Sequence, residues 1–297
     1  MNVSVIIVNY NTTRLLQQCV ESIVCHTHGV SYEIIVVDNH SSEKELTPLR
    51  KDCRITLIEL QENLGFGRAN NVGAAHAKGE HLFLLNPDTI LVNDAITILY
   101  QHLLSTPCTG LCGGNIFDEK MLPILSHHQI FPSILSEIDI AFGHLYYKLR
   151  YGRNSWFNHT KAPMKVAIIT GADMMIRREV WDKVSGFDPS FFMYYEDSDL
   201  CVRIKEQGYD IVNVPHAEII HLEGKSFHVS RERDLRYFGG RKCYFQTHYS
   251  AAYNKIADTL NITTLGFAII LCRLTGKQEA RQRYCQRLQV YKELTNN

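Results

Sequence analysis

The stretch VSVIIVN, residues 3–9, is an almost unbroken run of β-branched side chains that ends at a polar residue. Such a run is typical of a strand buried on both faces of a sheet. Between residues 15 and 24, apolar side chains then recur at the spacing of one helix face. A buried strand that leads directly into an amphipathic helix predicts an α/β fold built around a parallel sheet.

The alternation of strand and helix continues as far as residue 105. We expect further strands at 32–39, 55–60 and 81–86, and helices at 67–79 and 93–105. Because the links between them are short, these elements predict a mostly parallel sheet flanked by helices, in the manner of nucleotide-binding Rossmann-like folds.

Beyond residue 107 the pattern becomes less regular. The segment 118–163 is rich in aromatic residues and gives no clear assignment. Around it we expect a strand at 110–117, two strands flanking a turn at Gly171, a helix at 196–208, and a last strand at 209–215 that Pro215 ends.

Charge divides the chain into two parts. Residues 1–224 hold 18 Lys/Arg and 26 Asp/Glu, a net charge of −8, whereas residues 225–297 hold 13 and 5, a net charge of +8. A basic C-terminal region favours contact with an anionic surface, either a membrane or a nucleic acid. The alternative is that it neutralises the acidic body of the same chain.

The C-terminal region from residue 229 is predicted to be helical, with a capping-box pattern formed by Thr275 and Gln278. It contains no recognised nucleic-acid-binding module, so we expect no nucleic-acid partner. Its most apolar stretch, 262–274, is shorter than the ~18 residues of a spanning helix. This stretch is expected to lie in a membrane interface.

No secretion signal is expected, because the N-terminal sequence has neither a basic segment nor a cleavage site. The nine cysteines form no C-x-x-C pair, and Cys19 and Cys272 lie inside apolar runs. This usage indicates thiols in a reducing compartment rather than a disulfide or zinc framework. We therefore expect a cytoplasmic protein that lies peripherally at the inner face of the cytoplasmic membrane.

Polar residues follow each of the first four predicted strands. They are Asn9, Tyr10 and Asn11 after the first, Asp38 and Asn39 after the second, Asn63, Gly65, Gly67 and Arg68 after the third, and Asn86 with Asp88 after the fourth. Ligands of open parallel sheets bind at the carboxyl ends of the strands. These residues therefore form one predicted site if the strands are neighbours.

The predicted site suits a nucleoside diphosphate. Asp38 can accept hydrogen bonds from a base or a ribose, Gly65 and Gly67 would allow backbone N–H groups to approach a phosphate, and Arg68 is a bidentate cation. Each residue also has a structural alternative. Asn11 could cap a helix, Asp38 could form a turn, and the glycines could meet a need for positive φ.

A divalent metal is predicted at the fourth strand end. Asp88 offers a hard oxygen ligand to Mg²⁺ or Mn²⁺, which often share protein carboxylates with substrate phosphates. His221, after the last strand, could complete the metal site. The alternatives are that Asp88 belongs to a turn and that His221 is structural.

A second group of polar residues lies in FDPSFFMYYEDSDLCVRI, residues 187–204. Glu196, Asp197 and Asp199 crowd the first turn of a predicted helix beside an aromatic segment. One acid would suffice to complement the helix dipole, at ~0.3–1 kcal/mol. Three acids favour a general base with orienting neighbours.

Taken in order, these motifs resemble the family-2 inverting glycosyltransferases with a GT-A fold, and among them the bacterial rhamnosyltransferase-like members that build surface polysaccharides. The resemblance covers roughly residues 3–228. Its motifs are VIIVNYN (5–11), IIVVDNHSS (34–42), NLGFGRANNVG (63–73), LLNPDT (84–89), the segment 169–209 and PHAEIIHLEGKS (215–226).

The resemblance implies a catalytic domain at 1–228, with a nucleotide-sugar half at about 1–107 and an acceptor half at about 108–228, followed by the helical region 229–297. It implies that Asp38 contacts the nucleobase near Asn9–Asn11, that Asp88 and His221 hold the divalent metal, and that Asp197 of the Glu196–Asp197 pair is the catalytic base. Gly171, Ala172 and Asp173 would line the acceptor side.

One residue departs from the family pattern, because Asn86 replaces the first acid of the D-x-D motif. One carboxylate fewer predicts weaker metal binding. The implied reaction transfers a sugar, with dTDP-L-rhamnose as the favoured donor, to a saccharide or a lipid-diphosphate-linked acceptor in O-antigen or capsule synthesis. The helices beyond residue 229 would contact the membrane or, alternatively, pack on the catalytic domain or form a homodimer contact.

Two other functions remain open at this point. A nucleotidyltransferase would need a basic, glycine-rich loop after the first strand, where NYNTTR (9–14) has no glycine. A non-catalytic nucleotide-sugar-binding scaffold would tolerate the loss of Asp197.

Overall fold

The computed structural model describes residues 1–222 and 231–295. The predicted boundary at 228/229 and the end of the PHAEIIHLEGKS motif lie outside the described residues. The elements as far as residue 117 are β1 (Val3–Asn9), α1 (Thr13–His26), β2 (Tyr32–Asp38), α2 (Glu43–Leu49), β3 (Thr56–Glu59), α3 (Phe66–His76), β4 (His81–Leu85), β5 (Thr89–Leu91), α4 (Ala95–Ser105) and β6 (Thr109–Phe117).

The remaining elements include the acceptor half and three long C-terminal helices. They are β7 (His127–His128), α5 (Ile134–Ala141), α6 (Leu145–Tyr151), the 3-10 helix Gly152–Asn154, β8 (Met164–Lys165), β9 (Ile168–Ile169), β10 (Asp173–Arg177), α7 (Arg178–Lys183), α8 (Glu196–Glu206), β11 (Asp210–His221), α9 (Arg231–His248), α10 (Ala251–Leu274) and α11 (Gln278–Thr295).

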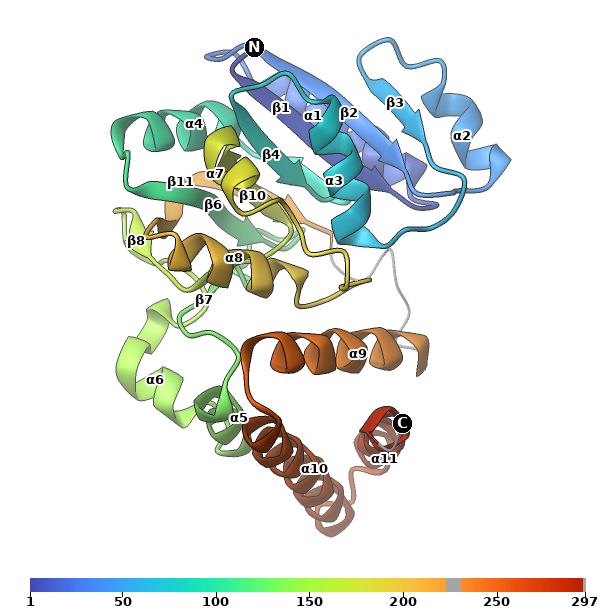
Figure 1. Cartoon of the computed structure of the whole chain (residues 1–297), viewed down its shortest axis with the longest axis vertical. Helices are drawn as coiled ribbons and strands as arrows, with labels where there is room; N and C mark the ends of the chain where they lie inside the picture. The colour runs from blue at the N-terminus through green and yellow to red at the C-terminus, as the bar shows by residue number, and fades with distance from the viewer. Residues whose placement is uncertain (223–230, 296–297) are drawn as a thin grey trace.

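A central sheet has the strand order β3-β2-β1-β4-β10-β6-β11-β5 (Figure 1). Strands β3, β2, β1 and β4 are parallel neighbours, as the sequence predicts, so their carboxyl ends meet at one edge. Strand β10 enters antiparallel between β4 and β6, which brings the segment before residue 173 to the same edge.

Both faces of this sheet are buried, which is why β1 lacks polar alternation. Val5 and Ile7 pack toward α1 and α4, whereas Ile6 packs in a second core with α7 and α8. At ~25 cal/mol per Å² of apolar surface, such two-sided burial is the main stabilising contribution of the sheet. The helices that cover it fix the positions of the loops at the strand ends.

Two details of the sheet differ from the prediction. Strand β11 does not end at Pro215 but continues to His221, because its register against β6 shifts between Asn213 and Glu218. Proline is tolerated at such an irregularity, where no ladder hydrogen bond is lost. The short strand β5 was not predicted, and it pairs antiparallel with the end of β11.

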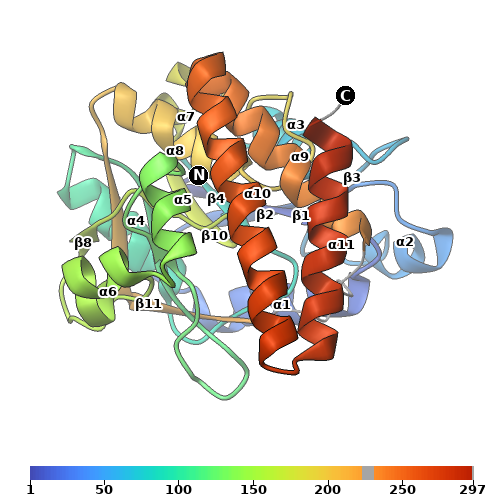
Figure 2. The ribbon, with the colours of Figure 1, turned by 90° about the horizontal axis from the view of Figure 1, so that it is seen from below.

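The C-terminal helices pack against the rest of the chain rather than apart from it. Figure 2 shows α10 beside α5 on one side and α11 on the other. The guanidinium group of Arg241 on α9 is buried and bonds with Glu137 of α5, Asp258 of α10 and Tyr291 of α11. One buried arginine therefore joins four helices.

Helix α10 is longer than the sequence suggested. Its 24 residues include an 18-residue window of mean hydropathy 1.4, so it passes a length and composition test for a membrane span, and only 17% of that window is buried. One such helix is weak support for a span. Thr275 caps the C-terminus of α10, where its hydroxyl donates to the Leu271 carbonyl, and does not begin α11 as the capping-box pattern predicted.

Candidate active site

The ends of β1 and β2 are held together by a buried carboxylate. Asp38 accepts hydrogen bonds from Asn9 Nδ2 at 2.7 Å and from the Ser41 N–H at 2.8 Å. All three residues are buried. Asp38 therefore forms the turn with Ser41 that was the structural alternative to a binding role. Its contact with a nucleobase stays a prediction.

Asn11 sets the shape of the loop after β1. Asn11 has φ of +55°, its N–H donates to Ser41 Oγ at 2.8 Å, and its side chain accepts from the Ser42 N–H. It does not cap α1, whose Thr13 N–H is instead bound by Glu45. Tyr10 is exposed beside this loop, where a ligand can reach its ring.

Two asparagines attach the loop after β3 to the end of β2. Asn39 donates to Asn63 Oδ1 at 2.9 Å and accepts from the Leu64 N–H at 2.8 Å. Asn63 in turn accepts from the Gly65 N–H. These bonds carry the loop to the carboxyl edge of the sheet.

Close packing against neighbouring residues explains why glycine occupies positions 65 and 67. Gly65 has φ of +84°, and a Cβ there would lie 2.1 Å from the Phe192 carbonyl oxygen, to which the Phe66 N–H donates. Gly67 is buried in α3 against Phe187. Arg68 donates to the Pro189 carbonyl at 2.8 Å. The loop is thereby joined to the segment before α8, and phosphate binding by it stays a prediction.

The fourth strand end meets the end of β11. His221 Nε2 lies 3.1 Å from Asp88 Oδ1 and 3.5 Å from Asn86 Nδ2. Within residues 1–222 and 231–295, no three His, Cys, Asp or Glu side chains gather as a metal cluster. One carboxylate and one imidazole fit a Mg²⁺ or Mn²⁺ ion that shares its remaining ligands with substrate phosphates.

The Glu196–Asp197 pair begins α8, next to the turn at Gly171. Asp197 Oδ2 accepts from the Gly171 N–H at 3.1 Å, and Oδ1 accepts from the Ser198 N–H. The carbonyl of Ala172 accepts from the Asn86 N–H at 3.0 Å. Two residues of backbone therefore connect Asp197 to the Asn86–Asp88 motif.

The two acids of the pair have different environments. Asp197 is partly exposed, whereas Glu196 is buried and its Oε2 has no hydrogen-bond partner among the described residues. Burial, and then repulsion from Asp197, raises the pKa of Glu196 to about 8. At neutral pH Glu196 is therefore protonated, and Asp197 is the carboxylate that a substrate can reach.

Asp199 does not belong to this pair, contrary to the prediction that all three acids act together. It is fully buried and binds Arg203 at 2.7 Å and His248 of α9 at 2.9 Å. Burial opposes ionisation, but the hydrogen bonds from His248 and Arg203 outweigh it and lower the pKa of Asp199. Asp199 therefore joins α8 to α9.

Asp173 occupies a different place from the one that the resemblance implied. Its side chain is fully buried and accepts from the Gly114 N–H of β6 at 2.5 Å, and burial raises its pKa well above the usual value. An acceptor cannot contact it in this arrangement. Of the other two residues, Gly171 is partly exposed in the turn before β10, whereas Ala172 is buried.

Several residues near this pair were not predicted to belong to the site. His128 of β7 lies close enough to Asp197 for the carboxylate to raise its pKa, although burial has the larger effect and lowers it. The Tyr195 hydroxyl donates to the Tyr237 hydroxyl of α9 at 3.2 Å, next to Tyr194. A Cβ at Gly240 would lie 2.3 Å from the Tyr194 carbonyl oxygen, so α9 packs directly on the turn before Glu196.

The curated proteins similar to this chain include some of comparable length and some that are several times longer. The chain is 27% identical over 232 residues to rhamnosyltransferase WbbL of Escherichia coli K12, covering 74% of this chain and 83% of that protein. It is 26% identical over 215 residues to the N-acetylglucosaminyl-diphospho-decaprenol L-rhamnosyltransferase of Mycobacterium tuberculosis H37Rv, covering 65% and 67%. It spans only 25% of the Sinorhizobium fredii protein y4gI, with 27% identity over 233 residues and 75% of this chain.

Among solved structures, the mannosyltransferase PcManGT from Pyrobaculum calidifontis, in complex with GDP-Man and Mn²⁺, superposes with a TM-score of 0.62 at 16% identity. The match covers 97% of this chain and 85% of that one and shows the shared fold. Residues 1–240 match the family described as "Glycosyltransferase like family 2". The chain therefore belongs to glycosyltransferase family 2 and has the GT-A fold.

Proposed function

We propose that this glycosyltransferase moves a sugar from a nucleoside-diphosphate donor to an acceptor hydroxyl with inversion at the anomeric carbon. The carrying observation is the unequal pair at the start of α8. Asp197 is an accessible carboxylate held by the Gly171 N–H, while Glu196 is buried and keeps its proton. A single accessible carboxylate suits a base and supplies no second, nucleophilic carboxylate.

In this mechanism Asp197 removes the proton of the acceptor hydroxyl as its oxygen attacks the anomeric carbon. The bond from that carbon to the diphosphate breaks on the opposite face, and its electron pair leaves with the diphosphate. A divalent ion held by Asp88 and His221 would neutralise charge on the leaving diphosphate when bound. Asp38 and the loop at 63–68 hold the nucleotide.

The names of the relatives support a narrower proposal for the substrates. Two of them are called rhamnosyltransferases, and one name includes a diphosphate-linked polyprenol. We infer dTDP-L-rhamnose as the donor and a saccharide, or a lipid-diphosphate-linked saccharide, as the acceptor. Surface polysaccharide such as O-antigen or capsule is the product class that fits these substrates.

An apolar surface on α5, α6 and α10 supports a peripheral position on a membrane. Its most exposed side chains are Phe142, Leu149, Phe267 and Leu274, which are 72%, 79%, 63% and 79% exposed. The same helices and the residues next to them carry exposed basic side chains, namely Lys148, Arg150, Arg153, Lys255, Arg273 and Lys277. Both acids of the segment 134–154 are buried.

We propose that this surface, termed the α5–α6–α10 face, lies on the anionic inner leaflet of the cytoplasmic membrane, where each Lys or Arg contributes about 1 kcal/mol. Flotation with vesicles containing phosphatidylglycerol tests this. The double change Leu149→Ser and Leu274→Ser should abolish flotation, and Leu104→Ser on α4, also an exposed leucine, should not. Wild-type protein that stays unbound at low salt would contradict the proposal.

Donor binding is tested by thermal shift with a panel of nucleotide sugars, with and without Mn²⁺. We expect the largest stabilisation with dTDP-L-rhamnose, since ligand binding to the folded state raises its stability by mass action. If only a different nucleotide sugar stabilises the protein, that sugar replaces dTDP-L-rhamnose as the proposed donor, and the proposed sugar transfer is unaffected. No stabilisation by any nucleoside diphosphate would refute the proposed function.

A further inference from the structure

The turn that begins α8 is built from two residues in an uncommon backbone conformation. Tyr194 and Tyr195 have φ of +71° and +68°. Residues other than glycine rarely adopt positive φ, and a bulky residue keeps it only where the surrounding structure holds it. The Tyr195 carbonyl accepts from the Asp199 N–H at 2.9 Å, which is the first backbone bond of α8. The turn therefore sets the direction in which α8 starts, and with it the place of Asp197.

One face of α9 lies against this turn. A Cβ at Gly240 would lie 2.3 Å from the Tyr194 carbonyl oxygen and 3.0 Å from that of Met193. Near Gly240 on the helix, the ring centroid of Tyr237 lies 5.9 Å from that of Tyr194 and 5.5 Å from that of Tyr195. The Tyr237 hydroxyl accepts from Tyr195 at 3.2 Å. Both the backbone and the side chains of the turn are therefore in contact with α9.

Close contact with the turn explains a glycine inside α9. Glycine weakens a helix relative to alanine, so its presence in the interior of this 18-residue helix needs a reason. At Gly240 the reason is the Tyr194 carbonyl, which a side chain would displace. At the neighbouring Gly239, a Cβ would meet nothing within 4 Å. The two glycines therefore separate contact with the turn from an effect on the helix itself.

The segment that leads into the turn also bonds with the loop between β3 and α3. The Phe192 carbonyl accepts from the Phe66 N–H at 2.9 Å, and Arg68 donates to the Pro189 carbonyl at 2.8 Å. This segment is therefore held by the loop and by α9 together. Since the loop is fixed to the end of β2 by Asn39, the position of α9 decides where the turn can lie.

We propose that Gly240 and Tyr237 are positioning residues for Asp197, because α9 holds the Tyr194–Tyr195 turn in its uncommon conformation. The assignment rests on the proposed function, in which Asp197 is the base. A base must lie within hydrogen-bond reach of the proton that it removes. A small displacement of the turn therefore lowers the rate of transfer and leaves donor binding intact. The helical region beyond residue 229 takes part in catalysis in this way, in addition to any contact with a membrane.

Steady-state kinetics of the full chain compares Gly240→Ala with its matched control, Gly239→Ala. The substrates are dTDP-L-rhamnose and a polyprenyl-diphosphate-linked saccharide. In Gly240→Ala we expect kcat to fall about a hundredfold, the effect of a displacement of about 1 Å, with the donor KM unchanged. Gly239→Ala should keep the kcat of wild type. An unchanged kcat in Gly240→Ala, an equal loss in both variants, or a loss of donor binding in step with kcat would overturn the proposal.

A second variant serves if Gly240→Ala does not fold. Tyr237→Phe keeps the ring contacts with Tyr194 and Tyr195 and removes only the hydroxyl to which Tyr195 donates. We expect kcat to fall about tenfold, the equivalent of one hydrogen bond, with stabilisation by dTDP and Mn²⁺ unchanged. A wild-type kcat in Tyr237→Phe would overturn the role of Tyr237.

Hydrogen exchange separates this inference from the proposed function, because it needs no substrate. The amides of residues 194–199 should exchange about tenfold faster in Gly240→Ala than in wild type or Gly239→Ala. If they do, but no nucleoside diphosphate stabilises the wild type, the proposed function fails and α9 still holds the turn. If dTDP stabilises the wild type and exchange is equal in all three proteins, the proposed function stands and this inference is wrong.

Discussion

The N–H of Gly171 donates to the Asp197 carboxylate at 3.1 Å, and the carbonyl of the following residue, Ala172, accepts from the Asn86 N–H. The proposed catalytic base and the proposed metal-site motif are thereby fixed to one short piece of backbone. Because β10 is antiparallel to β4, this piece begins where β4 ends. The pairing of β10 with β4 therefore sets the distance between Asp197 and the Asn86–Asp88 motif.

Asp197→Asn should abolish turnover and leave donor binding intact. The amide keeps the size of the side chain but cannot take a proton, so we expect a loss of about 10²–10⁴ in kcat. Transfer assays should be paired with thermal shift by dTDP and Mn²⁺. Full activity of this variant would refute the assignment of the base.

Asp199→Asn should act on stability instead. It removes the charge that His248 and Arg203 bind, and breaking a buried ion pair costs about 3 kcal/mol. The pKa of Asp199 is lowered by folding, so its stabilising effect is present above about pH 4 and is lost below it. Urea unfolding at pH 7 and pH 3.5 measures this. If Asp199→Asn is as stable as wild type but inactive, Asp199 acts with Glu196 and Asp197 in the reaction.

Glu196 should make the enzyme less stable as the pH rises. Its pKa is about 8 when folded and near 4.5 otherwise, so the folded state resists ionisation across that interval. Glu196→Gln stays neutral, and we expect it to exceed wild type by about 2 kcal/mol or more at pH 8.5 and to match it at pH 4.5. If the difference in unfolding free energy between Glu196→Gln and wild type is the same at both pH values, Glu196 is ionised in the folded protein.

Gly65→Ala should destabilise the loop between β3 and α3. The new Cβ would meet the Phe192 carbonyl, and φ of +84° disfavours any L side chain, at about 1–3 kcal/mol. Gly266→Ala in α10 is the control, because nothing lies within 4 Å and alanine is the better helix former by about 1 kcal/mol. Melting temperatures should move in opposite directions, and a tolerated Gly65→Ala would show that the loop can move away.

Asn86→Asp should strengthen metal binding, because it restores the first acid of the D-x-D motif beside Asp88. Its side chain lies 3.5 Å from His221, so a carboxylate there adds charge beside Asp88. We expect the Mn²⁺ concentration for half-maximal activity to fall about tenfold. Asp88→Asn should have the reverse effect, and an unchanged Mn²⁺ requirement in both would show that the ion binds elsewhere.

The sequence predicted most strands and helices of residues 1–107 well, apart from α2 and β5, because the predicted strands are apolar runs and the predicted helices have one apolar face. It failed where tertiary pairing decides the structure. Pro215 is tolerated at a register shift, and β5 forms only because β11 extends beside it. Neither fact is visible in a local pattern.

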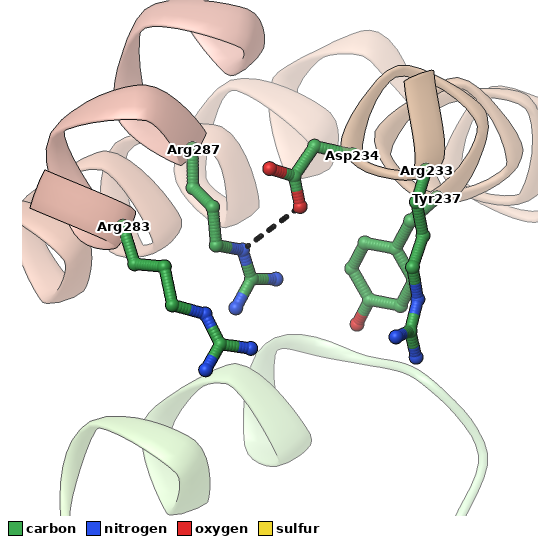
Figure 3. A pocket seen from close by; sticks show the side chains of 5 residues that line it. All are labelled: Arg233, Asp234, Tyr237, Arg283 and Arg287. Carbon is green, nitrogen blue, oxygen red and sulfur yellow. Dashed lines mark ion pairs between the residues drawn. The ribbon is translucent and has the colours of Figure 1, made fainter. Parts of the chain in front are cut away.

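The polar strand ends were identified correctly as neighbours, but their bonding was not. Asp38 and Asn9 bind each other, and Asp199 turns away from Asp197, because side-chain direction depends on packing. The cavity between α9 and α11 that Arg233 and Arg283 help to line (Figure 3) could not be predicted, because these residues lie fifty positions apart in the sequence and come together only when the two helices pack.

The buried Arg241 limits how this enzyme can be recombined with its relatives. Since it binds Glu137 and Asp258 at once, a chimera that exchanges only the C-terminal helices would leave a charge of one parent without its partner. A graft must carry Ile134–Ala141 together with α9, α10 and α11. The two segments form one exchangeable unit, although 89 residues separate them in the sequence.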